Sequence, residues 1–100
     1  MERAESDEIR GLLTGLIIRF GDRLTLEQQD WGQEFVDHNE LGLALESIAD
    51  WLSEAELPIS ESERADMLAL VGRMGMDGRV ERALAFCAVL PLGPPPGEVG

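Results

Sequence analysis

One hundred residues with 44% hydrophobic content fit one small domain with its own core and leave no room for a second. The formal net charge of −12, with eight arginines and no lysine, disfavours direct binding to nucleic acid, because phosphate contacts need a basic patch. No apolar run reaches the roughly 18 residues of a membrane span, and the first residues lack the basic-then-apolar order of a secretory signal, so we expect a cytoplasmic protein.

Helical periodicity is clearest near the N-terminus. Apolar side chains recur at spacings of three and four residues from Ile9 to Phe20, which predicts a helix with one apolar stripe. Ser6 is the expected N-cap of this helix, and Gly21 falls where the helix would end.

A second helix is predicted from the capping box of Thr25 and Gln28 to about Asp37. Its apolar face is thin, and the acidic residues along one side repel each other at spacings of three and four. We therefore expect the helix to depend on docking of Trp31 and Phe35 against the core.

The third predicted helix begins near Glu40 and ends at Leu57, because the residue before Pro58 is pushed out of helical geometry. Its expected core stripe is Leu41, Leu45, Ile48, Ala49 and Leu52. The opposite side carries Leu43 among the carboxylates of Glu46, Asp50 and Glu54, with Trp51 on the flank.

A second capping box, Ser60 with Glu63, opens a fourth predicted helix that ends at Gly75. Apolar residues cover most of its circumference, so we expect it to be the central, most buried helix. A last helix should follow the turn at Asp77-Gly78 and continue until Pro91, with Cys87 buried on its inner side.

Together these patterns predict an all-α fold, a compact bundle of about five short helices. We expect residues 1–90 to form a single domain. Residues 91–100 contain four of the five prolines and no periodic pattern, which predicts an extended or disordered tail rich in proline and glycine.

Catalytic and metal-binding residue types are scarce. The chain has one histidine, His38, no tyrosine and one cysteine, Cys87, which its apolar surroundings mark as a buried hydrophobe. No phosphate-binding loop occurs, and one histidine supplies too few donors for a zinc site. We therefore expect no enzymatic activity, catalytic residue, metal or cofactor.

Charge placement favours protein binding instead. Between Arg23 and Arg64 lie eleven carboxylates and no arginine or lysine, whereas the flanking segments sum to −1 and 0. Such a field steers a basic partner, although an acidic surface that only maintains solubility is an equally open interpretation. The candidate partner-binding residues are Glu34, Asp37, Glu40, Leu43, Glu46, Asp50, Trp51 and Glu54, with Trp31 a less certain anchor.

Residues 30–80 also resemble a known family. The run from Phe35 to Glu46, the segment through Trp51 and Glu54, and the turn Pro58-Ile59-Ser60 are similar in order to the Maf-type immunity proteins of bacterial polymorphic-toxin systems. That resemblance implies a protein that binds a co-expressed toxin, often a nuclease, and blocks its active site or substrate path. It names neither the toxin nor the oligomeric state.

Three other interpretations remain open at this point. An enzyme is the least expected of them and would be indicated by a pocket around His38. A nucleic-acid mimic that inhibits another basic protein would share the acidic face and differ only in its partner. An acidic helical adaptor would instead bind through Leu43 and Trp51 and respond little to salt.

Overall fold

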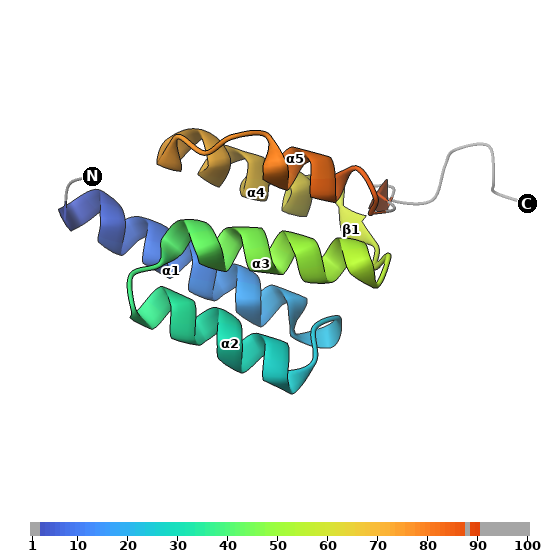
Figure 1. The fold of residues 1–100 in the computed structure, drawn as a ribbon, viewed down its shortest axis with the longest axis horizontal. Helices are drawn as coiled ribbons and strands as arrows, with labels where there is room; N and C mark the ends of the chain where they lie inside the picture. Colours follow the sequence, from blue (N-terminus) through green and yellow to red (C-terminus); the bar gives the residue numbers. More distant parts are fainter. Residues whose placement is uncertain (1–2, 88, 91–100) are drawn as a thin grey trace, which may run out of the picture.

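The computed structural model describes residues 3–87 and 89–90, and within them the fold is a bundle of five α-helices, as predicted, with one short ladder of two-residue strands (Figure 1). The elements in chain order are α1 (Arg3–Arg19), η1 (Phe20–Asp22), α2 (Leu26–Asp37), α3 (Leu41–Glu54), β1 (Ile59–Ser60), α4 (Glu61–Met74), α5 (Arg79–Leu84) and β2 (Val89–Leu90). Among the described residues, no helix is long and apolar enough to cross a lipid bilayer.

The helices form two layers around one core. In Figure 1, α2, α3 and α5 lie side by side in front, and α1 and α4 lie behind them. The core cluster draws on all five α-helices, with Ile9, Leu13, Phe20, Ile48 and Met67 among the side chains that have no exposed surface.

The central helix is α3, not α4. Helix α3 lies between α2 and α5 and buries Leu41, Ala44, Leu45, Ile48, Ala49 and Leu52. The prediction for α4 was wrong because much of its apolar surface consists of small side chains such as Ala65 and Ala69, which remain exposed.

Local hydrogen bonds set two of the helix starts. Both capping boxes are present, since Thr25 and Ser60 accept from the backbone N–H groups of Gln28 and Glu63, whose side chains accept from the cap residues in return. The expected cap at Ser6 is wrong. Helix α1 already begins at Arg3, and the Ser6 hydroxyl donates to Asn39 Oδ1 at 3.1 Å.

Three helices end in the same way. After α2, α3 and α4 comes one residue with positive φ, respectively Asn39 (59°), Glu56 (50°) and Gly75 (63°). The next N–H then bonds back across the last turn, for example from Leu57 to the carbonyl of Leu52 at 2.9 Å. This is the Schellman arrangement, and it satisfies carbonyls that a helix end leaves without partners.

The last helix is shorter than predicted. Helix α5 ends at Leu84, and Phe86 and Cys87 donate to carbonyls only three residues back, which makes turns and not helix. Val89 then pairs with Ile59 in a two-residue parallel ladder that the sequence pattern did not reveal. The predicted tail, residues 91–100, lies outside the described residues.

Candidate protein-binding site

Helix α2 docks through a glycine and leaves its tryptophan outside. Gly32 is buried, and a Cβ there would lie 3.3 Å from Ile17 Cδ1 and 3.7 Å from Trp51 Cζ3. Trp31 is 52% exposed, so the expectation that it anchors the helix in the core is wrong. Phe35 does pack against the core, as predicted.

A groove runs between α2 and α3 on the front of the molecule. This aromatic groove has a volume of about 610 Å³ and is lined by Thr25, Glu27, Gln28, Trp31, Phe35, Ser47 and Trp51. The ring centroids of Trp31 and Phe35 are 5.9 Å apart. Trp51 is half-buried against the core and forms a wall of the groove. Trp31 contacts Phe35 with one part of its ring and leaves the other part exposed to solvent.

Carboxylates lie on both helices that form the groove, although only Glu27 lines it directly. We use the name acidic face for these residues of α2, α3 and the loop between them: Glu27, Asp30, Glu34, Glu40, Glu46, Asp50 and Glu54. Glu27, Asp30 and Glu34 also line a shallow hollow of about 300 Å³ beside Trp31. Leu43 is 43% exposed on the outer side of α3, as the helical spacing predicted.

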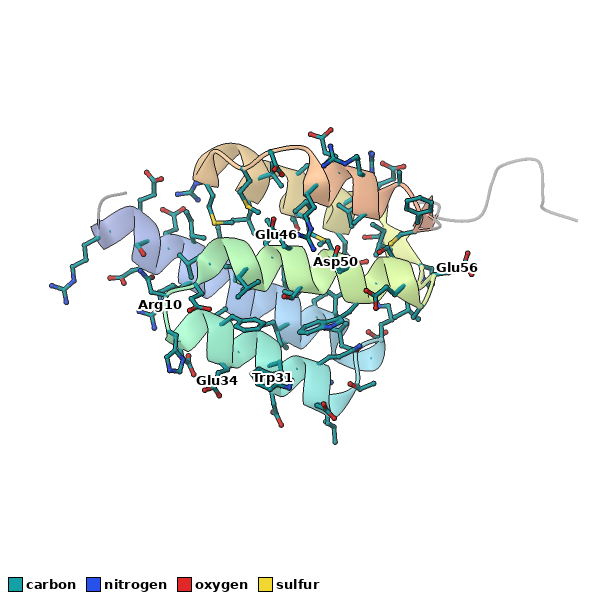
Figure 2. The ribbon with its side chains drawn as sticks, in the orientation of Figure 1. Arg10, Trp31, Glu34, Glu46, Asp50 and Glu56 are labelled. Carbon is teal, nitrogen blue, oxygen red and sulfur yellow. The ribbon has the colours of Figure 1, made fainter. Side chains whose placement is uncertain are left out.

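The structure divides the predicted binding residues. Figure 2 shows Trp31 and Glu34 on α2, whereas Glu46 and Asp50 lie on the side of α3 nearer α5. Asp37 lies apart, because Gln33 Nε2 donates to its Oδ1 at 3.0 Å and also contacts Thr14 of α1 at 3.5 Å. Asp37 therefore belongs to the α1 side of α2 rather than to the groove.

One carboxylate of the acidic face has an arginine partner. Arg79 Nη2 of α5 donates to Asp50 Oδ2 at 2.7 Å. The pKa of Arg79 is raised by this hydrogen bond and by the nearby charges of Asp50 and Glu46. Within the described residues, the other six members of the acidic face make no ion pair with an arginine, so most of its negative charge is uncompensated.

His38 ends α2 beside the acidic face. Its Nδ1 lies 2.9 Å from the backbone carbonyl of Glu34 and 3.8 Å from that residue's carboxylate. The hydrogen bond to the carbonyl and the neighbouring negative charges raise the pKa of the imidazole. His38 therefore loses its proton at a higher pH than an isolated histidine, and it hydrogen-bonds locally.

The described residues contain no group of three or more histidine, cysteine or acidic side chains placed to hold a metal ion. Cys87 is buried, and burial raises the pKa of its thiol. A thiol with a raised pKa is a poor nucleophile, because the thiolate is the reactive form.

Sequence reasoning missed two features. Gln28 and Ser47 line the groove but carry no pattern of their own, although their positions beside Trp31 and Trp51 on the two helices could have pointed to them. Glu63 was counted among the uncompensated carboxylates, yet it is 3% exposed and paired with Arg19 and Arg23. No signal near Glu63 in the sequence reveals partners about forty residues away.

No protein-family model, curated protein or solved structure matches this chain. The functional inference therefore depends on the charge, exposure and shape of the α2–α3 surface and on the residue pattern described above.

Proposed function

We propose that this chain is an immunity protein that binds and neutralises a cognate toxin of a polymorphic-toxin system, a basic nuclease domain, in the cytoplasm of the producing cell. The observation that carries the proposal is the charge of α2, α3 and the loop between them. Residues 26–54 hold eight carboxylates and no arginine, and they surround exposed apolar side chains. The resemblance of residues 30–80 to Maf-type immunity proteins supports the same function.

A basic toxin surface complements this arrangement in two ways. The uncompensated carboxylates accelerate encounter, since electrostatic steering raises association rates above those of neutral pairs. Nuclease domains bind phosphate rows, so a surface with rows of carboxylates competes for the same cationic side chains. Blocking those side chains removes the path that the nucleic acid would take.

Anchoring would come from the apolar side chains of the face. Trp31 exposes its ring beside Glu27 and Glu34, so an arginine or lysine of the partner can stack on the ring and pair with a carboxylate. Leu43 adds exposed apolar area on α3. Tryptophan and arginine are the residue types that most often dominate binding energy in interfaces.

The test is protection by charge-reversed variants. We expect a basic toxin domain to be encoded beside this chain, and that domain is expressed in cells that carry either the wild-type chain or Glu46→Lys with Glu54→Lys. These two residues lie on the acidic face and make no ion pair within the described residues, so the reversal should abolish protection while the helical circular-dichroism spectrum stays unchanged. Cells that carry the wild-type chain should survive.

The matched control is Asp7→Lys with Glu61→Lys, which makes the same change in net charge on exposed residues of α1 and α4. Protection should persist in this control. Loss of protection in both variants would show that only total charge matters, and full protection by Glu46→Lys with Glu54→Lys would exclude the acidic face as the interface.

An acidic helical adaptor is the second candidate, because Trp31 on α2 and Leu43 on α3 are both exposed apolar side chains, and Leu43 lies one turn before Ser47 of the aromatic groove. An adaptor would bind an amphipathic helix in the aromatic groove. Replacing Leu43 by serine would then abolish binding, and charge reversal on the rim would have little effect.

A further inference from the structure

A second groove lies on the back of the molecule, between α1 and α4. It has a volume of about 370 Å³ and is lined by Gly11, Leu12, Gly15, Leu16, Arg19, Asp66, Ala69, Leu70 and Arg73. Buried Leu16 and Leu70 form its floor, while Leu12 is 46% exposed at its edge. At Gly11 and Gly15 an added Cβ would meet no atom within 4 Å, so the surface of α1 is open there.

Charge limits what can cover this groove. Helix α1 carries three acidic residues and three arginines, and α4 carries three and two. In the front layer, in contrast, α2, α3 and the loop between them hold eight carboxylates and no arginine from residue 26 to residue 54, and α5 adds only two arginines. Two copies of this chain repel each other at their front layers, so the back is the face on which they can meet.

The charges at the two ends of the groove are opposite in sign on each helix, so this face is complementary to the same face of a second copy turned by 180°. At one end, Glu8 of α1 pairs with Arg73 of α4 at 3.1 Å. At the other end the signs are exchanged: Arg19 of α1 pairs with Glu63 of α4 at 2.7 Å, and Asp66 follows Glu63 by three residues along α4. A negative and a positive group thus alternate around the apolar centre.

We propose that this face binds a second copy of the chain, with α1 antiparallel to α1 across a two-fold axis. In this register Glu8 faces the partner subunit's Arg19, and Asp66 faces the partner subunit's Arg73. The same axis brings Leu12 against the partner subunit's Gly15, where the missing side chain leaves room. A symmetric interface of this kind uses one patch on both copies.

The dimer leaves the proposed toxin-binding surface free. Helices α1 and α4 form the rear layer, and the aromatic groove opens between α2 and α3 in the front layer (Figure 1). This inference therefore does not rest on the proposed function. A chain that dimerises but does not bind toxin would contradict the proposed function alone. A monomeric chain that still neutralises toxin would contradict the dimer alone.

Sedimentation equilibrium over a concentration series measures the association directly. The wild-type chain should approach twice the mass of one chain as its concentration rises. Leu12→Glu should keep it monomeric, because the new carboxylate would be buried in the apolar centre without a partner. The control Leu26→Glu lies on α2, where Leu26 is 78% exposed, and should dimerise like the wild type.

A charge exchange tests the register. Glu8→Arg combined with Arg73→Glu preserves the ion pair within one chain and leaves the net charge unchanged. Across the proposed two-fold axis, however, the new arginine would face the partner subunit's Arg19, and the new glutamate would face the partner subunit's Asp66. The dissociation constant of the dimer should rise about tenfold or more relative to the wild type, because attractive charge pairs become repulsive ones. A wild-type chain that stays monomeric, dimerisation of Leu12→Glu, or an unchanged affinity after the exchange would each overturn the proposal.

Discussion

Arg23 and Glu63 are joined by two parallel hydrogen bonds, from Nη1 to Oε1 at 2.7 Å and from Nη2 to Oε2 at 2.8 Å. Arg19 Nε donates to the same Oε2 at 2.7 Å, and the backbone N–H of Ser60 donates to Oε1 at 2.8 Å. The Arg23 guanidinium also lies 4.7 Å from the centre of the Phe20 ring. This cluster ties the end of α1 to the start of α4.

Replacing Glu63 by glutamine should destabilise the protein by about 3 kcal/mol, because it leaves the largely buried guanidinium of Arg23 without its counter-charge. The side chains of Arg23 and Glu63 are only 15% and 4% exposed, so water cannot replace the lost interaction fully. Urea unfolding followed by circular dichroism measures the change. Glu61→Gln is the control two residues earlier, where an exposed side chain should change stability by less than about 0.5 kcal/mol.

The same cluster predicts a specific response to acid. Hydrogen bonds from Arg23, the Ser60 N–H and Arg19 lower the pKa of Glu63 from 4.5 to about 2. A carboxyl group with a lower pKa in the folded state stabilises that state above its unfolded pKa and loses this contribution as it becomes protonated. Its contribution should therefore be complete above pH 4.5 and disappear as the pH falls toward 2.

The difference in stability between wild type and Glu63→Gln isolates this contribution, because protonation of the many surface carboxylates affects both proteins. The difference should be constant above pH 4.5 and should shrink by roughly 3 kcal/mol toward pH 2. Urea unfolding at a series of pH values provides the data. A difference that stayed constant throughout would mean that Glu63 has the same pKa in the folded and unfolded chains.

Sequence reasoning succeeded where the physical cause is local. The capping boxes at Thr25 and Ser60, and the end of α4 at Gly75, depend on residues three or four positions apart and were predicted correctly. The ion-pair partners of Glu63 were not predicted, because Arg23 lies forty residues earlier and only the folded chain brings the two together. Charge counted along the sequence therefore overstated the unpaired charge of the middle segment.

The candidate site shows the same division. Helical spacing placed Leu43 outward correctly, since that assignment needs only the core stripe of its own helix. Trp31 was assigned to the core because apolar residues are expected inside, but the close approach at Gly32 docks α2 and turns Trp31 outward. The ion pair of Asp50 with Arg79 depends on how α5 packs, which no local pattern reveals.

Glu56 gives a prediction about backbone strain. It follows α3 with φ of 50°, a conformation that costs most residues energy and glycine almost none. Glu56→Gly should raise the free energy of unfolding by about 0.5–1 kcal/mol, measured by urea unfolding. Glu56→Gln keeps the strain and removes only the charge, so an equal gain in both variants would attribute the effect to charge instead.

The two tryptophans should respond differently to one substitution. Trp31→Ser should lower the free energy of unfolding by only about 1 kcal/mol, because the ring is 52% exposed and loses mainly its contact with Phe35. Trp51→Ser should cost about 2 kcal/mol or more, since its half-buried ring packs on the core and against Gly32. If urea unfolding gave the same loss of stability for both variants, Trp51 would not be packed more tightly than Trp31.

Salt should slow the association of this chain with a basic toxin domain. Ions screen charges separated by more than about 8 Å at physiological ionic strength, so steering by the acidic face weakens as salt is added. We expect stopped-flow association rates to fall steeply with sodium chloride, while dissociation rates change much less. Glu46→Lys with Glu54→Lys should lower the rate at low salt and flatten its salt dependence. An association rate that is the same at low and high salt would remove electrostatic steering from the mechanism.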